Sequence, residues 1–368
     1  MLRVALLDTT LEGSRGSMTR YRLQLQRALE EFASDDVQAD VLYLGRRNRS
    51  ATSTVPAKLE TYARHYRCWR DARKIDASNH DLFHVLDGSF GYVSSAIRSK
   101  RTVVTVHDVI PRLQMDRRFP SAPAVAFPSR WLIRRSLRGV AGARMVCSVS
   151  QSTKNDLIQL GCRADARIHV VPMAIEPGLF QGSNPAFEES KPQSFLLHLG
   201  NNGFYKNRRG AIEVFRRIEN DHDLHLILAG PPPDAALREF VLEHRLEDRV
   251  QYEVDPDQRT LGKLYAQSRI FLFPSLYEGF GWPPLEAMSV GCPVVCSDAG
   301  SIPEVVGDAA MVVPSEDYDG MARRCEQLLS DQELREAMIA KGLECVQRHN
   351  LERLATQMLV IYREANAS

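Results

Sequence analysis

The chain has 368 residues, of which 44% are hydrophobic and 25% are charged, and its formal net charge is +1. This composition is typical of a soluble globular protein, and no stretch reaches the roughly 18 uninterrupted apolar residues that a membrane-spanning helix needs. The chain is longer than an ordinary domain with one hydrophobic core, so two domains are expected. Its seven cysteines include no CxxC pair, which argues against a metal or redox protein.

The two halves of the chain carry opposite charge. Residues 1–180 contain 28 Lys and Arg against 17 Asp and Glu, whereas the remainder contains 19 against 29. Halves of opposite sign predict two domains with different partners, and the basic half favours an anionic or membrane-held partner. Nucleic acid fits less well, because no nucleic-acid-binding motif occurs.

The first half alternates apolar runs with amphipathic segments. The run at 3–8 is typical of a buried strand rather than of a signal peptide, so we expect a cytoplasmic protein. The loop that follows, 11–21, contains glycine but neither GxGxxG nor GxxxxGK[ST], which argues against a dinucleotide oxidoreductase and a P-loop nucleotidase. Apolar residues spaced three and four apart then predict a helix over 17–33. Further strands are expected at 37–45, 81–88, 101–110 and 143–150, and a helix at 150–161.

Two features of this half have more than one interpretation. His107 and Asp108 end the strand at 101–110, and a histidine there more often packs or bonds to the backbone than binds a ligand. Basic and aromatic residues mingle in 62–74 and 130–139. On helices they would form either a face for an anionic lipid or acceptor, or ordinary helices with solvated arginines over a buried aromatic stripe.

The second half repeats the alternation of strands and helices. Near-continuous apolar strands separated by helices predict parallel sheets covered on both faces, and two such sheets in series make two Rossmann-like domains. Ligands bind at the carboxyl ends of such strands, so we expect the site in a cleft between the domains. The expected strands are 194–200, 224–230, 250–254, 269–275 and 293–298.

One strand, 194–200, is followed by a polar turn and Lys206. A cation at the end of a strand can neutralise a diphosphate leaving group, although Lys206 could also be an ordinary surface lysine. The sequence DHD at 221–223 resembles a metal-binding DxD, but it precedes its strand instead of ending it, so we expect a turn there and no metal.

The stretch SLYEGFGWPPLEAM, 275–288, follows another buried strand and predicts a ligand site at the start of a helix. Prolines suit a first helical turn, the N–H groups of such a turn attract phosphate, and Gly279 and Gly281 allow a ligand to approach the backbone. Carboxylates repel phosphate, so Glu278 and Glu286 are better suited to the hydroxyl pairs of a ribose or hexose. The alternative is that Glu286 only complements the helix dipole in the first turn and Glu278 is a solvated charge.

The stretch EGFGWPPLEAMSVGCPVVCSDAGSIPEVVGDAAMVVP, 278–314, resembles the signature of the retaining group 1 glycosyltransferases, also called glycosyltransferase family four. The alternation of elements is similar to that family over essentially the whole chain. The resemblance implies an α/β protein of the GT-B fold, with two Rossmann-like domains whose parallel sheets face a cleft. It implies an acceptor domain over 1–175, a nucleotide-sugar-binding domain over 176–349, and a C-terminal helix, 350–368, that packs back on the first domain.

The resemblance also implies roles for the residues of the second domain. Glu286 would bind the nucleotide ribose and Glu278 the hydroxyls of the donor sugar, while Phe280 and Gly281 would offer N–H groups near the sugar and diphosphate. Lys206 matches one member of a basic pair that faces the diphosphate. Asn201 stands where the other member, an arginine, is usual, and Arg208 or Arg209 could compensate.

In the first domain, the resemblance implies that His107, and with it Asp108, contacts the donor sugar, where a neutral imidazole would serve best. Gly16 matches a glycine that lets the acceptor and donor phosphate approach the first turn.

Taken with these features, the resemblance implies a metal-independent hexosyltransferase without a cofactor. It would transfer a hexose to a glycan or lipid-linked acceptor in polysaccharide or glycoconjugate biosynthesis. GDP-mannose is slightly favoured over a UDP-sugar, because GFGWPPLEAM resembles the same stretch of mannosyltransferases. The enzyme could contact the inner face of the cytoplasmic membrane peripherally. The alternatives are a nucleotide-sugar epimerase or phosphorylase on the same architecture and a non-catalytic nucleotide-sugar-binding protein.

Overall fold

The computed structural model describes residues 1–14, 16–46, 57–99, 101–162, 165–176, 194–219 and 223–367. They form two compact units, one of residues 1–174 together with 351–368, the other of residues 175–350. The DHD sequence and the polar stretch 181–194 lie largely outside the described residues. No helix of the described chain is both long and apolar enough to cross a bilayer.

The first unit is built on a parallel six-stranded sheet in the order β2-β1-β3-β4-β5-β6. The four central strands are nearly all buried, as expected for a sheet covered on both faces. The strands are β1 (Leu2–Asp8), β2 (Val37–Tyr43), β3 (Leu82–Val85), β4 (Thr102–Val106), β5 (Met145–Ser148) and β6 (Ile168–Val170).

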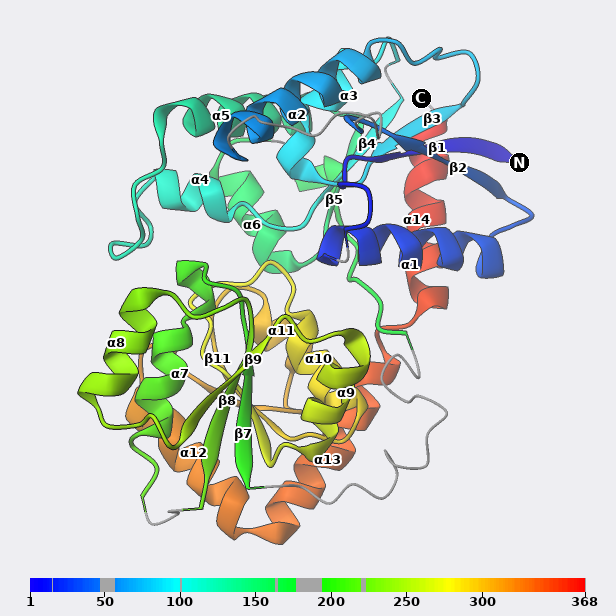
Figure 1. The fold of residues 1–368 in the computed structure, drawn as a ribbon. Helices are drawn as coiled ribbons and strands as arrows, with labels where there is room; N and C mark the ends of the chain where they lie inside the picture. The colour runs from blue at the N-terminus through cyan, green and yellow to red at the C-terminus, as the bar shows by residue number, and fades with distance from the viewer. Residues whose placement is uncertain are drawn as a thin grey trace. The chain divides into compact units, whose positions relative to one another are not determined.

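Right-handed crossovers place the helices of this unit on the two faces of its sheet. The first face carries α2 (Ala57–Ala72), α3 (Tyr92–Ala96), α5 (Phe127–Gly142) and α6 (Gln151–Gln159) (Figure 1). The short helix α4 (Ile110–Met115) follows β4. The opposite face carries α1 (Ser17–Phe32) and the C-terminal helix α14 (Leu351–Asn366), which pack against each other. Buried residues at helical spacing along α14, among them Leu354, Met358 and Tyr362, anchor it in this unit.

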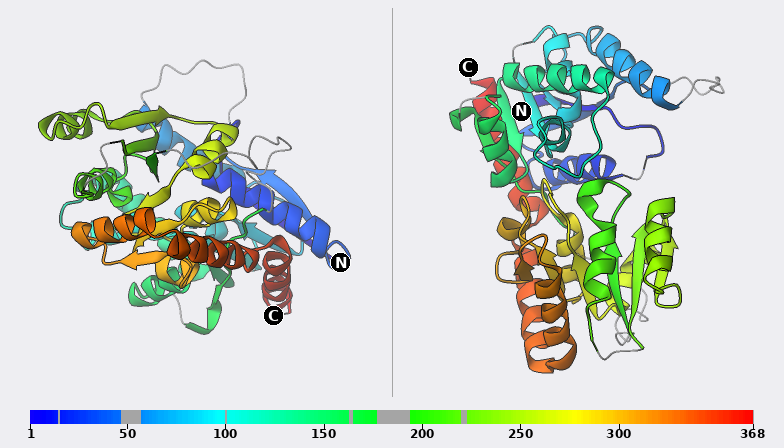
Figure 2. Two further views of the ribbon diagram at one scale, coloured as in Figure 1. Left: turned by 90° about the horizontal axis from the view of Figure 1, so that it is seen from below. Right: turned by 90° about the vertical axis from the view of Figure 1, so that its left-hand side faces the viewer.

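The second unit repeats the design with the strand order β12-β11-β10-β7-β8-β9, again all parallel. Its strands are β7 (Phe195–Leu199), β8 (His225–Gly230), β9 (Val250–Val254), β10 (Ile270–Phe273), β11 (Val294–Ser297) and β12 (Met311–Val313). The helices α7 (Arg208–Phe215), α8 (Ala235–Glu243) and α12 (Tyr318–Ser330) cover one face, and α9 (Gln258–Gln267), α10 (Trp282–Ser289), α11 (Ile302–Val306) and α13 (Gln332–Gln347) cover the other (Figures 1 and 2).

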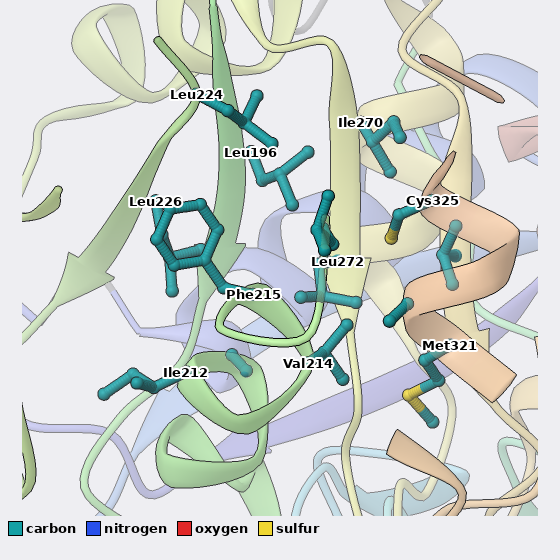
Figure 3. Close-up of a cluster of buried hydrophobic side chains, with 14 of the residues drawn as sticks. Leu196, Ile212, Val214, Phe215, Leu224, Leu226, Ile270, Leu272, Met321 and Cys325 are labelled. Carbon is teal, nitrogen blue, oxygen red and sulfur yellow. The ribbon is translucent and has the colours of Figure 1, made fainter. Parts of the chain in front are cut away.

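The core of the second unit lies between its sheet and the helices α7 and α12. Figure 3 shows Val214 and Phe215 of α7 gathered with Leu226 and Leu272 of the strands, and all four side chains are inaccessible to solvent. Burying each such side chain stabilises the fold by about 1.5–3 kcal/mol. This packing holds the sheet edge from which the candidate site projects. All seven cysteines are buried and unpaired.

Candidate functional site

Two buried carboxylates lie beside the turn between β10 and α10. Glu278 is 7% exposed and Glu286 is 4% exposed. A charge removed from water is costly unless other groups pair with it, so the partners of these glutamates define the site. The alternative that Glu278 is a solvated loop charge is therefore wrong.

Glu278 forms an ion pair with Lys206. The Lys206 Nζ lies 2.7 Å from the Glu278 Oε1, although 72 residues separate them in sequence. The loop after β7 is held against the loop after β10 by two bonds, because the Leu276 N–H donates to the Tyr205 carbonyl at 2.7 Å and the Asn207 Nδ2 donates to the Pro274 carbonyl at 2.8 Å. These bonds bring the cation and the carboxylate together at the carboxyl ends of adjacent strands.

Glu286 is held from the neighbouring helix. The Tyr265 hydroxyl of α9, itself inaccessible to solvent, donates to the Glu286 Oε2 at 2.9 Å. Helix α10 begins at Trp282 after the N-cap Gly281, so Glu286 is its fifth residue and no acidic residue occupies its first turn. Compensation of the helix dipole in the first turn therefore does not explain this glutamate.

Two glycines and a serine hydroxyl fix the shape of the turn that carries Glu278. Gly281 has φ +104°, in the region that favours glycine. The Ser301 hydroxyl is within hydrogen-bond distance of the carbonyls of Glu278 (3.0 Å) and Phe280 (2.7 Å). Gly300 has φ +61°, and a Cβ there would lie 2.4 Å from the Glu278 carbonyl oxygen, so only glycine fits.

The same turn presents two backbone donors. Within the part of the chain that the structure describes, the N–H groups of Phe280 and Gly281 donate to no acceptor. Pro283 and Pro284 follow in the first turn of α10 and have no N–H groups, so the amides of the preceding turn add to the few donors at this helix start. Free amides beside a lysine are suited to an anion.

Asn201 and its arginine neighbours lie at the same edge of the sheet. Asn201 is exposed; its Oδ1 accepts from the Gly203 N–H at 2.8 Å and its Nδ2 donates to the Tyr205 hydroxyl at 3.3 Å. Arg208 is buried and donates through Nη1 to the Pro231 carbonyl at 2.9 Å, whereas Arg209 lies over the ring of Phe240. Asn201 brings no charge, and burial lowers the pKa of Arg208.

His107 follows β4 in the first unit. Its Nε2 lies 2.9 Å from the Leu86 carbonyl, which can only accept, so Nε2 carries the proton and Nδ1 is left as an acceptor. Burial is the main cause that lowers the pKa of His107, which keeps the imidazole neutral near pH 7. Its ring packs edge-on against Tyr21 of α1, 4.7 Å between centroids.

The two other residues singled out in this unit have local roles. The Asp108 Oδ1 accepts from the Ile110 N–H at 2.9 Å at the start of α4. Gly16 is the N-cap of α1 in an extended conformation (φ −71°, ψ 172°), which any residue adopts. Gly13, with φ +75°, is the glycine whose backbone this loop requires.

Comparison with known proteins assigns the chain to a family. Residues 183–344 match the family model described as glycosyl transferases group 1, and residues 20–179 match glycosyltransferase family 4. The chain is 30% identical to the O-antigen chain mannosyltransferase B of Escherichia coli over 72% of this chain and 71% of that protein. The chain belongs to the group 1 glycosyltransferases. This glycosyltransferase is also 28% identical to the MMP alpha-(1->4)-mannosyltransferase of Mycolicibacterium hassiacum, over 72% of the chain and 66% of that protein.

Solved structures of this class share the fold of the glycosyltransferase. Sucrose-phosphate synthase from Thermosynechococcus elongatus is similar with a TM-score of 0.77 and 19% identity over 100% of both chains. Anabaena HepE in complex with UDP and glucose has a TM-score of 0.71 and 16% identity, covering 97% of this chain and 98% of its own. The predicted α/β fold with two Rossmann-like domains, the GT-B class, is confirmed.

Sequence reasoning missed two residues that shape the site of this glycosyltransferase. Tyr265 supports Glu286, and Ser301 holds the turn of Glu278. Neither residue type is distinctive, and both reach the site only through the packing of α9 and of the loop before α11. Among the described ranges, no three His, Cys, Asp or Glu side chains are grouped so as to hold a metal ion.

Proposed function

We propose that this glycosyltransferase transfers a hexose from a nucleoside diphosphate sugar to a hydroxyl of a glycan or lipid-linked acceptor in polysaccharide or glycoconjugate biosynthesis, with retention of anomeric configuration. GDP-mannose is the favoured donor, because the two relatives described above are named as mannosyltransferases. A UDP-sugar is the alternative, since HepE was solved with UDP-glucose.

One observation carries the proposal: the Lys206–Glu278 pair lies in the same unit as the two free amides of the Glu278 turn. A diphosphate needs cations and N–H donors, whereas sugar hydroxyls need acceptors. A nucleotide sugar has both groups joined at one glycosidic bond. In this proposal Lys206 and the amides of Phe280 and Gly281 hold the diphosphate, and Glu278 accepts from the sugar hydroxyls.

Glu286 binds the ribose in this proposal. The Tyr265 hydroxyl holds one carboxylate oxygen, which orients the group toward a diol. Gly279 allows close approach of the ligand, and Asn201 supplies a neutral hydrogen bond in place of a second cation. Gly16, His107 and Asp108 are assigned to the donor from the first unit, the histidine as a neutral dipole toward the sugar.

No side chain is assigned as a covalent nucleophile. The bond between the anomeric carbon and the phosphate oxygen breaks as the acceptor oxygen bonds to that carbon from the same face. The departing diphosphate oxygen takes the proton of the acceptor hydroxyl. Lys206 and the amides stabilise the charge that grows on the diphosphate, so the reaction needs no metal ion.

A two-stage experiment tests this proposal. Thermal stabilisation across GDP-mannose, UDP-glucose and other nucleotide sugars identifies the donor, and NMR of its slow hydrolysis with added EDTA then reports the anomer formed first. Release of α-mannose and GDP supports the proposal, and release of the β-anomer contradicts retention. An isomerised nucleotide sugar indicates an epimerase, phosphate-dependent turnover a phosphorylase, and tight binding without turnover a binding protein.

A further inference from the structure

The first unit contains a cavity that the proposed transfer does not use. It has a volume of about 600 Å³, within the range of small-molecule sites, and lies among α2, α3 and α5. Aromatic rings dominate its wall: Tyr62, Tyr66, Trp69, Tyr92, Phe127 and Trp131.

Several of these rings are exposed to solvent even though they line the same cavity. Phe127 is 82% exposed, Tyr66 61% and Trp131 55%. Phe127, Trp131 and Arg135 are four residues apart on α5, so they form one stripe along the helix. A contiguous patch of exposed aromatic side chains indicates a binding site, whereas single exposed aromatic residues scattered over a surface do not.

Three polar side chains of the wall already have hydrogen-bond partners within this unit. The Tyr92 hydroxyl donates to the His65 carbonyl at 3.0 Å and accepts from the His65 Nδ1 at 3.0 Å. The Tyr62 hydroxyl lies 3.2 Å from the Ser129 hydroxyl. Burial lowers the pKa of His65 to about 4, so its ring is neutral near pH 7. The rest of the wall is largely ring and aliphatic carbon, which suits a hydrocarbon chain because such a chain needs no polar partner.

Positive charge runs along the same helix. Arg130, Arg134 and Arg138 are exposed at intervals of four residues, and α5 contains no acidic residue. Arg135 lines the cavity, with its guanidinium 5.0 Å from the ring centroid of Trp131 and 5.6 Å from that of Tyr92. An apolar cavity beside uncompensated arginines is complementary to an apolar chain that ends in an anion.

We propose that this cavity binds the hydrocarbon chain of an anionic amphiphile, whose phosphate lies at the arginines of α5. The identity of the amphiphile as the lipid-linked acceptor rests on the proposed function, but its binding does not. The occupant is a single lipid molecule within the cavity rather than the surface of a bilayer.

Calorimetric titration of the full-length protein with decyl phosphate, below its micellar concentration, tests the proposal. We expect binding, with an affinity at least about tenfold lower in the double variant Phe127→Ser/Trp131→Ser. The variant Arg130→Gln/Arg134→Gln should also bind decyl phosphate more weakly. Both pairs are largely exposed, so the variants should fold, which circular dichroism checks. The matched controls are Leu23→Ser/Phe32→Ser on α1 and Arg238→Gln on α8, which should bind as the parent protein does.

Three outcomes would overturn the proposal. The first is that decyl phosphate produces no heat of binding, and the second is that the Phe127→Ser/Trp131→Ser variant binds decyl phosphate as tightly as the parent protein. The third is that the parent protein binds the sugar maltotriose more tightly than decyl phosphate and that the same variant abolishes this binding. Binding to phosphatidylglycerol vesicles without binding to monomeric decyl phosphate would indicate a membrane surface instead. Donor affinity, measured separately, should be unchanged in these variants. If the parent protein binds no nucleotide sugar, the proposed function is contradicted, but the cavity proposal still stands.

Discussion

Lys206 and Glu278 are both largely buried, so each depends on the other for neutralisation. Replacing Glu278 with Gln keeps an oxygen that can accept from the Lys206 ammonium but removes the charge. We expect turnover, measured as release of nucleoside diphosphate from the identified donor, to fall about a hundredfold, because an electrostatic contact to the reacting sugar is lost. Affinity for the free nucleoside diphosphate should change much less.

The exposed Glu333 of α13 provides the matched control for that variant. Glu333→Gln removes one carboxylate from the same unit and should leave turnover unchanged. Full activity in Glu278→Gln would show that Glu278 has no part in positioning the sugar. A fall in nucleotide affinity as large as the fall in turnover would assign Glu278 to the nucleotide instead.

Glu286 makes a different prediction, because its proposed partner is the ribose. Glu286→Gln should weaken binding of the nucleoside diphosphate by about tenfold, which corresponds to the loss of one charge-assisted hydrogen bond. Binding of inorganic pyrophosphate, which has no ribose, should not change. Calorimetry with both ligands measures the difference, and an equal loss for both would contradict the ribose assignment.

Residue type and spacing raised Glu278, Glu286 and Lys206 as candidates, and their roles followed only from the resemblance to the family. The structure pairs Glu278 with Lys206. Their supporting partners could not be predicted. Tyr265 lies 21 residues before Glu286 and Ser301 lies 23 residues after Glu278, and each contact depends on how a separate element packs. The resemblance points to Gly16, whereas the positive φ in that loop belongs to Gly13.

At the scale of elements, the turn of Glu278 depends on the loop between β11 and α11. Gly300→Ala would place a methyl group against the Glu278 carbonyl in a backbone conformation that already disfavours alanine. We expect a loss of unfolding free energy of about 2–4 kcal/mol, together with weaker donor binding. Thermal unfolding and donor titration measure the two effects.

Gly291 supplies the control for the backbone effect alone. It has φ +76°, follows α10 in the same unit, and an added Cβ would meet only an ordinary contact with Ile339 at 3.5 Å. Gly291→Ala should cost about 1 kcal/mol and leave donor affinity unchanged. Equal effects of the two variants would mean that the close approach of Gly300 to Glu278 does not shape the site.

Hydrophobic periodicity predicted the long buried strands, because continuous apolar runs between helices are typical of parallel sheets. It missed β6 and β12, because three residues are too few to show a period. The basic and aromatic residues at 62–74 and 130–139 are also evident in the sequence, but the cavity among α2, α3 and α5 is not. That cavity arises from the packing of three helices distant in sequence, which periodicity within each segment does not report.

At the scale of the whole molecule, each unit encloses a histidine that is inaccessible to solvent. His84 lies within hydrogen-bond distance of the Tyr362 hydroxyl of α14 (2.8 Å) and of the Thr105 hydroxyl (2.7 Å), and the His198 Nδ1 donates to the Leu272 carbonyl at 3.0 Å. Burial is the main cause that lowers the pKa of each to about 3 from an ordinary value of 6.5. Both are therefore neutral in the folded protein at any pH near neutrality.

The unfolded chain takes up a proton at each of these histidines below pH 6.5, whereas the folded protein does not. The stability that each contributes is therefore complete above pH 6.5 and is lost as the pH falls from 6.5 toward 3. At pH 5.5 the loss is about 1.4 kcal/mol of unfolding free energy for each histidine.

Denaturant unfolding at pH 7.5 and at pH 5.5 measures this loss. His84→Gln and His198→Gln should each be less stable at pH 7.5 but should reduce the difference between the two pH values by that amount. Because the two sites lie in different units, the reductions should add in the double variant. A single variant that keeps the full pH dependence would show that its histidine is protonated in the folded protein.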